Sequence, residues 1–254
     1  MRISGNTIFI PGATSGIGLA LATRLHDAGN TVIVGGRREE LLAEIAAQHP
    51  GIDTVRIDTT DADSIAAASA DVLARHPGLN VVIAMAGIMR VENWPAGGFR
   101  HDAEDIVTTN LLGPIRLIDV FLPHLLAQPD ATLMTVSSGL AFVPLRVTPT
   151  YNATKAAIHM LSETLRLQLA GTSVRVVELE PPSVATDLMP GQRDSDFAMP
   201  LDAFADEVLT ILRERPDVTE VQVERVKFLR YAEQRGDYPD VVATLNAADP
   251  HAAA

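Results

Sequence analysis

Tyr151 and Lys155 lie four residues apart in a segment with helical periodicity, a spacing that places both side chains on one face of a helix. A free phenol titrates at about 10, so at neutral pH it needs help to give or take a proton. The Lys155 ammonium would stabilise a phenolate and lower the pKa of Tyr151, which would suit this residue to general acid–base work. Ser138, thirteen residues upstream, has a hydroxyl that can stabilise charge developing on a substrate oxygen. A tyrosine–lysine pair at this spacing is also common on exposed helices, so the pair alone does not define a site.

A glycine-rich stretch near the N-terminus is suited to binding phosphate. Gly12 permits a tight turn, Gly16 lets the backbone approach a pyrophosphate, and Gly18 allows close packing of helix on strand. Free N–H groups and the positive end of the following helix dipole would face the anion. The predicted phosphate contacts are Gly12, Thr14, Ser15, Gly16, Ile17 and Gly18. A strand-to-helix turn that binds nothing is the alternative reading of the glycines.

The elements that must position these residues alternate along the chain. Strands are predicted over Thr7–Ile10, Thr31–Gly35, Thr54–Ile57, Asn80–Met85, Ala131–Val136, Ser173–Leu179 and Thr219–Val223. Helices are predicted over Gly16–Ala28, Glu39–Gln48, Asp61–Arg75, Asp102–Leu126 (with a candidate break at Gly113-Pro114) and Thr150–Ala170. The strands are nearly continuous apolar runs, which is typical of parallel strands covered on both faces. The pattern predicts an α/β fold of the Rossmann type, with a doubly wound, mostly parallel seven-stranded sheet and helices on both faces. We expect a single domain over residues 1–254, with a frayed tail at 250–254.

Composition excludes several other classes of protein. The 254 residues have a formal net charge of −12, which disfavours binding to nucleic acid or to anionic membrane surfaces. The absence of cysteine excludes disulfides, a cysteine-based zinc site and a catalytic thiol. The seven histidines show no spacing typical of metal ligands, so no metal is expected. We find neither a signal-peptide pattern nor a stretch of about 20 apolar residues, and we therefore expect a cytoplasmic protein without a membrane partner.

Taken together, these motifs resemble those of the short-chain dehydrogenase/reductase family. The spacing Gly-x-x-x-Gly-x-Gly, Asn110, Ser138 and the Tyr151–Lys155 pair occur in the family's order, and the resemblance runs from residue 5 to about 190. It implies hydride transfer between nicotinamide and a ketone, an aldehyde or a secondary alcohol. Tyr151 would be the acid or base, and Lys155 would also contact the nicotinamide ribose. The resemblance alone assigns Asn110 to holding a water that links Lys155 to solvent.

The end of the second predicted strand indicates which nicotinamide cofactor is used. Family members that bind NAD have an acidic residue there, whereas this chain has Val34-Gly35-Gly36-Arg37-Arg38. The guanidinium groups of Arg37 and Arg38 are suited to a 2′-phosphate. NADP(H) is therefore predicted in preference to NAD(H). A solvated start to the next helix is the alternative reading of the two arginines.

The resemblance implies further cofactor contacts and also shows departures from the family pattern. Contacts are expected from Asp58, Thr59, Ala86, Gly87, Pro181, the backbone of Val184 and the hydroxyl of Thr186. Pro11 and Ala84-Met85 replace polar residues of the family, and Pro182 replaces its usual glycine. Pro11 and Ala84 should lie side by side. Because both partners of a polar contact are then lost together, the cost should be small.

The substrate side is predicted to be apolar, with a lid over about residues 188–215. The residues expected there are Leu140, Phe142, Pro144, Leu145, Met189, Phe197, Met199 and, more weakly, Trp94. Residues 179–187 and 223–234 are similar to a bacterial oxidoreductase subgroup associated with D-alanyl–lipoteichoic acid. Because the two long helices have more apolar surface than one sheet face needs, a homodimer or homotetramer is expected.

Two alternatives to a reductase remain at this stage. One is a non-catalytic NADP(H)-binding sensor or scaffold, which the changes at Pro11 and Ala84-Met85 would permit. The other is an epimerase or dehydratase acting on nucleotide-linked substrates. Such enzymes commonly have larger C-terminal domains than the stretch that follows Thr186.

Overall fold

Seven strands form one sheet in the order β3-β2-β1-β4-β5-β6-β7, and every neighbouring pair is parallel. The computed structural model describes residues 1–247, so the tail expected at 250–254 lies outside the described residues. The strands are β1 (Thr7–Pro11), β2 (Thr31–Gly36), β3 (Asp53–Arg56), β4 (Val81–Ile83), β5 (Ala131–Val136), β6 (Val174–Leu179) and β7 (Glu220–Val221). The predicted fold class is confirmed, with β4 and β7 shorter than expected.

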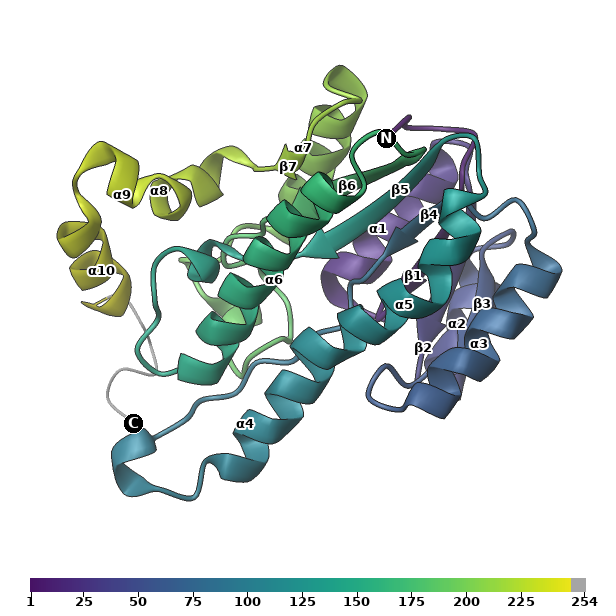
Figure 1. Ribbon diagram of the computed structural model, residues 1–254. Coiled ribbons are helices and arrows are strands. Elements are labelled where there is room, and N and C mark those ends of the chain that lie inside the picture. The colour runs from purple at the N-terminus through teal and green to yellow at the C-terminus, as the bar shows by residue number, and fades with distance from the viewer. Residues whose placement is uncertain (248–254) are drawn as a thin grey trace.

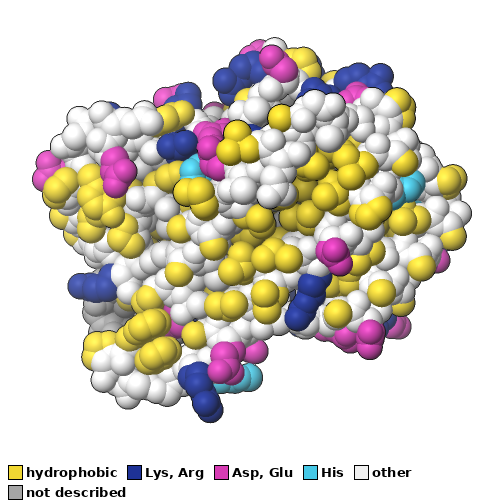
Figure 2. All heavy atoms as spheres, viewed as in Figure 1, with side chains coloured by type: hydrophobic (Ala, Val, Ile, Leu, Met, Phe, Trp, Pro, Cys, Tyr) yellow, Lys and Arg dark blue, Asp and Glu magenta, His cyan; other side chains and the backbone are white. Residues whose placement is uncertain are grey.

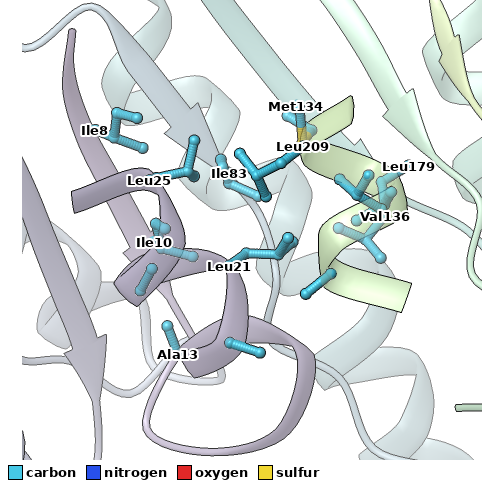
Figure 3. Close-up of a cluster of buried hydrophobic side chains, with 14 of the residues drawn as sticks. Ile8, Ile10, Ala13, Leu21, Leu25, Ile83, Met134, Val136, Leu179 and Leu209 are labelled. Carbon is cyan, nitrogen blue, oxygen red and sulfur yellow. The ribbon is translucent and has the colours of Figure 1, made fainter. Parts of the chain in front are cut away.

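Helices cover both faces of this sheet (Figure 1). On one face lie α1 (Gly16–Asp27), α2 (Glu39–Gln48) and α7 (Leu201–Glu214). On the other lie α3 (Ala62–Arg75), α5 (Gly113–Leu126) and α6 (Pro149–Gln168). Figure 3 shows the first core, in which Leu21 and Leu25 of α1 meet Ile8 and Ile10 of β1 and Leu209 of α7. This two-sided burial explains why the strand sequences do not alternate between polar and apolar residues.

The helix leading to α5 is continuous where a break was considered. It begins as α4 (Arg100–Val107), widens into a π-helical turn over Thr108–Leu112 and continues directly into α5. Pro114 is the second residue of α5, directly after the π turn, and the backbone keeps its helical conformation across the junction. The expected break is therefore wrong, and the irregularity is the π turn just before it.

This continuity also corrects the expectation about apolar stretches. By length and composition, the helix over Arg100–Leu126 is able to cross a membrane, with a mean hydropathy of 1.3 in its most apolar window. However, 44% of that window is buried inside the protein, and Leu117, Phe121 and Leu125 belong to the second core. We therefore interpret it as a core helix of the doubly wound fold.

The sequence prediction did not include the helices after residue 200. In α7, Phe204 and Val208 are fully buried and the helix packs on α1, so residues 201–214 of the expected lid belong to the core. Beyond β7 come a 3₁₀ turn (Glu224–Val226), α8 (Lys227–Arg230), α9 (Ala232–Arg235) and α10 (Tyr238–Ala247). We call residues 224–247 the C-terminal segment. It extends to one side of the main body, near the start of α6 (Figure 1).

Candidate active site

Tyr151 and Lys155 occupy the first turns of α6, and both are buried, with 6% and 5% of their surface exposed. The Lys155 Nζ lies 5.4 Å from the centre of the Tyr151 ring and donates a hydrogen bond to the Val136 carbonyl at 2.9 Å. α6 begins at Pro149, whose fixed φ suits the first turn of a helix. The predicted spacing therefore brings both groups to the carboxyl end of β5.

A buried carboxylate that the sequence analysis missed holds the start of α6. Glu92 accepts hydrogen bonds from the Thr150 amide at 2.8 Å and the Thr150 hydroxyl at 2.7 Å. A carboxylate at this position satisfies a free N–H and interacts favourably with the helix dipole. The contact spans 58 residues of chain, so no local sequence signal reveals it. Glu92 thereby positions the turn that carries Tyr151.

Ser138 follows β5 and lies beside the tyrosine. Its Oγ accepts a hydrogen bond from the Leu140 amide at 3.1 Å and donates to the Pro181 carbonyl at 3.4 Å. Burial raises the pKa of Tyr151 to about 12, and a hydrogen bond with Ser138 opposes this only in part. Burial also lowers the pKa of Lys155 to about 8. The lowered pKa predicted for Tyr151 is thus wrong for the chain by itself, because desolvation of the phenolate outweighs its local stabilisation.

Asn110 lies in the π-helical turn, a feature that often marks functional positions. Its side-chain amide exchanges two hydrogen bonds of 2.8 Å with the backbone of Ile88 and donates a longer one to Thr154 at 3.4 Å. A Cβ added to Gly87 would lie 3.5 Å from the Asn110 Oδ1 and 3.8 Å from the Lys155 Nζ. Asn110 and Lys155 therefore flank the same glycine, and the fold brings all four predicted catalytic residues together.

The phosphate loop, residues 12–18, is shaped by close backbone approach. Gly12 has φ of 90°, and a Cβ added there would lie 2.5 Å from the Cα of Ala86, so a larger residue would not fit. A Cβ added to Gly16 would lie 3.5 Å from the Cγ2 of Thr186. The loop, Ala86 and Thr186 thus gather at the carboxyl ends of the strands, where doubly wound sheets bind nucleotides. The narrow backbone cradle fits a pyrophosphate.

Of the two arginines after β2, Arg38 is the one that lies on this loop. Its guanidinium donates hydrogen bonds to the Thr14 hydroxyl at 3.0 Å and the Ser15 hydroxyl at 3.5 Å. Arg37 instead interacts electrostatically with Asp58. Arg38 therefore places a positive charge on the phosphate loop of a chain that is strongly acidic overall.

Asp58 and Thr59 lie at the carboxyl end of β3, on the same side of the sheet. Burial works to raise the pKa of Asp58, but hydrogen bonds from the Thr60 hydroxyl and amide and the nearby arginines outweigh it and lower that pKa. Thr59 is buried, and its carbonyl lies 3.0 Å from the position of a Cβ on Gly113. The Asp58 carboxylate is therefore ionised at neutral pH and available as a hydrogen-bond acceptor.

The departures from the family pattern lie next to each other, as predicted. β1 and β4 pair with Ile8 opposite Val81 and Phe9 opposite Val82, so the same register continued by two residues brings Pro11 level with Ala84. The missing N–H of Pro11 and the apolar side chain of Ala84 are thus neighbours. Because both positions are apolar, neither residue leaves the other with an unsatisfied buried hydrogen-bonding group. An unsatisfied group of that kind is what would cost stability.

The segment from Pro181 to Thr186 closes the site beside Ser138. The Pro181 carbonyl accepts a hydrogen bond from the Gly139 amide at 2.9 Å, and the Val184 carbonyl accepts one from the Gln192 side chain at 2.7 Å. Val184 also pairs with Met199 in a short parallel bridge. These contacts hold the segment in place despite Pro182, which lines the neighbouring cavity.

A cavity of about 320 Å³ opens against Ser138 and Tyr151. The described residues that line it are mostly apolar: Met89, Leu140, Leu145, Pro182, Ser183, Leu188, Met189, Gln192, Ser195, Phe197, Arg225, Phe228, Leu229, Thr244 and Leu245. A volume of this size suits a small organic substrate. Four of the predicted substrate-side residues are on this list, but five residues of the C-terminal segment were not foreseen.

Four other residues predicted for the substrate side do not line the cavity. Phe142 packs against His159 and Arg230, and Trp94 stacks on Phe99 with ring centres 4.3 Å apart. Met199 is taken up by its bridge to Val184 and by the first core. Pro144 lies beyond the cavity lining as well. Phe142, Pro144 and Met199 were chosen for their place after Ser138 or Thr186, and Trp94 for its place after the fourth strand, but place in the sequence does not determine the direction of a side chain.

The C-terminal segment reaches the cavity by packing on the residue after Ser138. A Cβ added to Gly139 would lie 2.8 Å from the Cδ1 of Leu229 and 3.0 Å from the Cγ2 of Val226. Behind this contact, Arg230 forms two ion pairs. Its Nε lies 3.5 Å from the Oε2 of Glu180, and its Nη2 lies 3.2 Å from the Oε2 of Glu220. The absence of a side chain at Gly139 therefore lets α8 lie directly against the serine turn.

Three carboxylates and a histidine cluster around that arginine. Ligand atoms of His159, Glu178, Glu180 and Glu220 all lie within 4.8 Å of one another, a grouping that the histidine spacing in the sequence did not suggest. Arg166 and Arg230 lie among the carboxylates as ion-pair partners. Burial, followed by repulsion from Glu178 and Glu220, raises the pKa of Glu180 to about 8. The cluster joins β6, β7 and α8 rather than opening into the cavity.

Known proteins share this architecture. The family model described as short chain dehydrogenase matches residues 6–196. The uncharacterized oxidoreductase DltE of Bacillus subtilis (strain 168) is 39% identical over 249 residues, covering 97% of this chain and 98% of the relative. A short chain dehydrogenase from Burkholderia cenocepacia J2315 in complex with NADP has a TM-score of 0.81 at 24% identity, covering 96% of this chain and 99% of its own. An alcohol dehydrogenase from the archaeon Thermococcus sibiricus, complexed with 5-hydroxy-NADP, has a TM-score of 0.76 at 26% identity, covering 86% and 96%.

The chain belongs to the short-chain dehydrogenase/reductase family and is an oxidoreductase of that family. The similarity to DltE-like oxidoreductases, inferred from two short stretches, is confirmed by the DltE relative, which matches nearly the whole chain.

Proposed function

We propose that this protein transfers a hydride between NADP(H) and a ketone, an aldehyde or a secondary alcohol, with Tyr151 as the general acid or base. The observation that carries the proposal is that Tyr151 and Ser138 both face one apolar cavity of about 320 Å³. Lys155, on the same helix face, lies 5.4 Å from the tyrosine ring. A substrate oxygen in this cavity is within reach of two hydroxyl groups.

The residues around the phosphate loop are suited to hold the cofactor. The loop N–H groups would bind the pyrophosphate, and Arg38 with Arg37 would bind the 2′-phosphate of NADP(H). Asp58, Thr59, Ala86 and Gly87 would border the adenosine side, and Pro181, Val184 and Thr186 the nicotinamide side. NADP- and 5-hydroxy-NADP-bound structural neighbours support this choice of cofactor, as does the position of Arg38 on Thr14. When bound, the reduced nicotinamide supplies the hydride.

In the direction of reduction, Tyr151 gives its proton to the carbonyl oxygen as the hydride adds to the carbonyl carbon, and the product is an alcohol. Because its pKa is about 12, Tyr151 holds that proton at neutral pH. Ser138 donates a hydrogen bond to the same oxygen and stabilises its developing charge. The Lys155 ammonium then stabilises the phenolate, and Asn110 would hold a water that returns a proton from solvent. Oxidation of an alcohol uses the same groups in reverse.

The direct test follows NADPH absorbance in the presence of a panel of ketones and aldehydes. Oxidation that requires both protein and carbonyl compound supports the proposal. Tight NADPH binding with no turnover on any compound would instead favour a sensor or scaffold. Ser138 and Tyr151 face a cavity in this protein, which a scaffold would not need, so we favour the enzyme.

We also propose that two or four copies assemble. Figure 2 shows hydrophobic side chains across the face formed by α5 and α6. Leu167 is 79% exposed and Met160 63%, while Ile115 and Leu126 on α5 are about half-exposed. A second copy packed on this face would remove these side chains from water. Sedimentation at micromolar concentration should show a dimer or tetramer that Met160→Glu with Leu167→Glu dissociates, and a wild-type monomer would contradict the proposal.

A further inference from the structure

One charged side chain at the cavity has no part in the proton transfer proposed above. Arg225 is the only charged residue among the described residues that line the cavity, and it lies in the 3₁₀ turn that opens the C-terminal segment. It is exposed, and its side chain makes no ion pair or hydrogen bond with any other described residue. This guanidinium is therefore available to something that enters the cavity.

The acidic residue next to Arg225 in the chain, Glu224, has other partners. Glu224 pairs with the Lys227 Nζ at 2.5 Å, and Glu207 accepts a hydrogen bond from the Glu224 amide at 2.5 Å. The chain contains 32 acidic and 20 basic residues, so there are enough carboxylates to pair with every arginine. An arginine that remains unpaired at a cavity in such a chain points to an anion supplied from outside.

The packing of the C-terminal segment holds Arg225 near the reacting groups. Val226, the next residue, packs on Gly139, and Gly139 is the next residue after Ser138. Most of the cavity wall near these residues is apolar, including Leu140, Leu229 and Leu245. The cavity thus offers hydroxyls at Ser138 and Tyr151, an apolar wall, and one cation.

We propose that the substrate is a carbonyl compound with an apolar body and an anionic group, a carboxylate or a phosphate, which Arg225 binds. The planar guanidinium can donate two parallel hydrogen bonds to either anion. The apolar wall would contact the apolar body of such a compound and remove it from water. This inference rests on the proposed function, since it names the substrate class of the same site.

The first test compares matched substrates that differ only in charge. Oxooctanoic acids with the keto group at successive carbons are assayed beside their methyl esters, with wild type and Arg225→Gln. The ratio of kcat/KM for the acid to kcat/KM for the ester should fall about 10-fold in Arg225→Gln, mainly through KM, as expected for a partly solvated charge-assisted hydrogen bond. High salt should reduce the wild-type ratio, because exposed charges are screened.

Further variants distinguish a direct contact between Arg225 and the substrate anion from an effect of the protein's total charge. Arg213→Gln removes an equal charge from an exposed position on α7 outside the cavity lining, and should leave the acid-to-ester ratio within about 2-fold of wild type. Arg225→Glu should disfavour the acid more strongly than Arg225→Gln. Keto phosphate monoesters, compared with their parent alcohols, show whether phosphate is preferred to carboxylate at the same arginine.

A binding measurement keeps this inference separate from the proposed function. Octanoate and methyl octanoate, which have no ketone to reduce, are titrated calorimetrically into the NADPH-loaded protein. Octanoate binding that weakens about 10-fold in Arg225→Gln supports the anion site, whether or not any carbonyl compound is reduced. A failure to reduce every carbonyl compound would count against the proposed reductase activity and not against the anion site. Equal binding of octanoate by wild type and Arg225→Gln, or an acid-to-ester ratio that Arg225→Gln does not change, would overturn the inference.

Discussion

The phosphate loop and the C-terminal segment border the two sides of the candidate site, yet they are built in different ways. The loop is a single run of seven residues whose glycines permit close contacts such as Gly12 with Ala86. The C-terminal segment consists of a 3₁₀ turn and three short helices, held by contacts with residues about 40 to 100 positions earlier in the chain, such as Glu180 with Arg230 and Pro144 with Asn246. Backbone geometry defines the first region, whereas side-chain packing defines the second.

This difference indicates how proteins of one fold can bind the same cofactor and yet differ in substrate specificity. The groups that a dinucleotide contacts are largely backbone atoms, which most substitutions leave in place. The cavity, by contrast, is lined by side chains from the turn after β5, residues 182–197 and the C-terminal segment. Substitutions there change shape and charge without disturbing the sheet. Tyr151 and Ser138 lie at the boundary, where both sides meet.

The largest expected effect is at that boundary. Tyr151→Phe removes one hydroxyl from a packed helix and should leave NADPH affinity and folding nearly unchanged. Turnover should fall by about 10²–10⁴-fold, which is typical for loss of a positioned acid. Turnover with the best carbonyl substrate, NADPH titration and thermal unfolding are measured together. A Tyr151→Phe protein that keeps most of its reduction rate would refute the assignment.

On the cofactor side, Arg38→Ala should weaken NADPH binding about 10–100-fold, because it removes charge-assisted hydrogen bonds to the 2′-phosphate. NADH binding should change much less, since NADH lacks that phosphate. Arg37→Asp should shift preference toward NADH by removing a phosphate partner and supplying an acceptor for the ribose hydroxyls. Fluorescence titration with both cofactors measures these effects, and equal wild-type affinity for NADH and NADPH would contradict the assignment.

On the substrate side, Gly139→Val should displace the C-terminal segment, because Leu229 and Val226 leave no room for the new side chain. Overpacking of this kind costs about 1–3 kcal/mol of unfolding free energy. We expect a higher KM for substrate and little change in the affinity for NADPH. Gly78→Val is a matched control, since an added Cβ there meets nothing within 4 Å. Equal loss of substrate and cofactor affinity would show that the two regions do not act separately.

The smallest effect on catalysis is expected at the buried carboxylates that anchor α8, where the change is one of stability. The pKa of Glu180 is about 8 in the folded protein and 4.5 as its ordinary value, so the folded state binds this proton more tightly than the unfolded state. The unfolding free energy contributed by Glu180 should therefore decrease as pH rises from about 4.5 to about 8. Glu180→Gln should flatten that decrease, as measured by urea unfolding between pH 5 and 9. Glu104→Gln, at an exposed position on α4, is the control. An unchanged slope in Glu180→Gln would show that this carboxyl is ionised throughout.

Much of the sheet could be predicted because each strand is a local pattern. β5 lies where it was expected, and the ends of β1 and β2 differ by one residue. The helices α8 and α9 have only four residues each, too few to show a helical period. α7 does have the period, with Phe204, Val208 and Leu212 buried, but the polar stretch before it led to its interpretation as part of a lid.

For the site, prediction succeeded where a motif lies within one element or next to it. Tyr151 and Lys155 are one helical turn apart in the same helix. The phosphate loop lies within a single strand-to-helix connection. The position of Glu92 under Thr150 and of Leu229 on Gly139 depends instead on how distant segments pack. In the chain by itself the pKa of Tyr151 is raised rather than lowered for the same reason, since burial cannot be read from neighbouring residues.

The sequence by itself determines the parallel sheet, the phosphate loop and the spacing of the tyrosine and lysine, because strand and helix periods and glycine turns depend on residues close together in the chain. Only the tertiary structure decides that α7 belongs to the core, that Arg38 rather than Arg37 lies on the loop, and that Arg225 faces the cavity. Each of these depends on contacts between segments far apart in sequence, and their free energy comes from burial and charge in the packed chain.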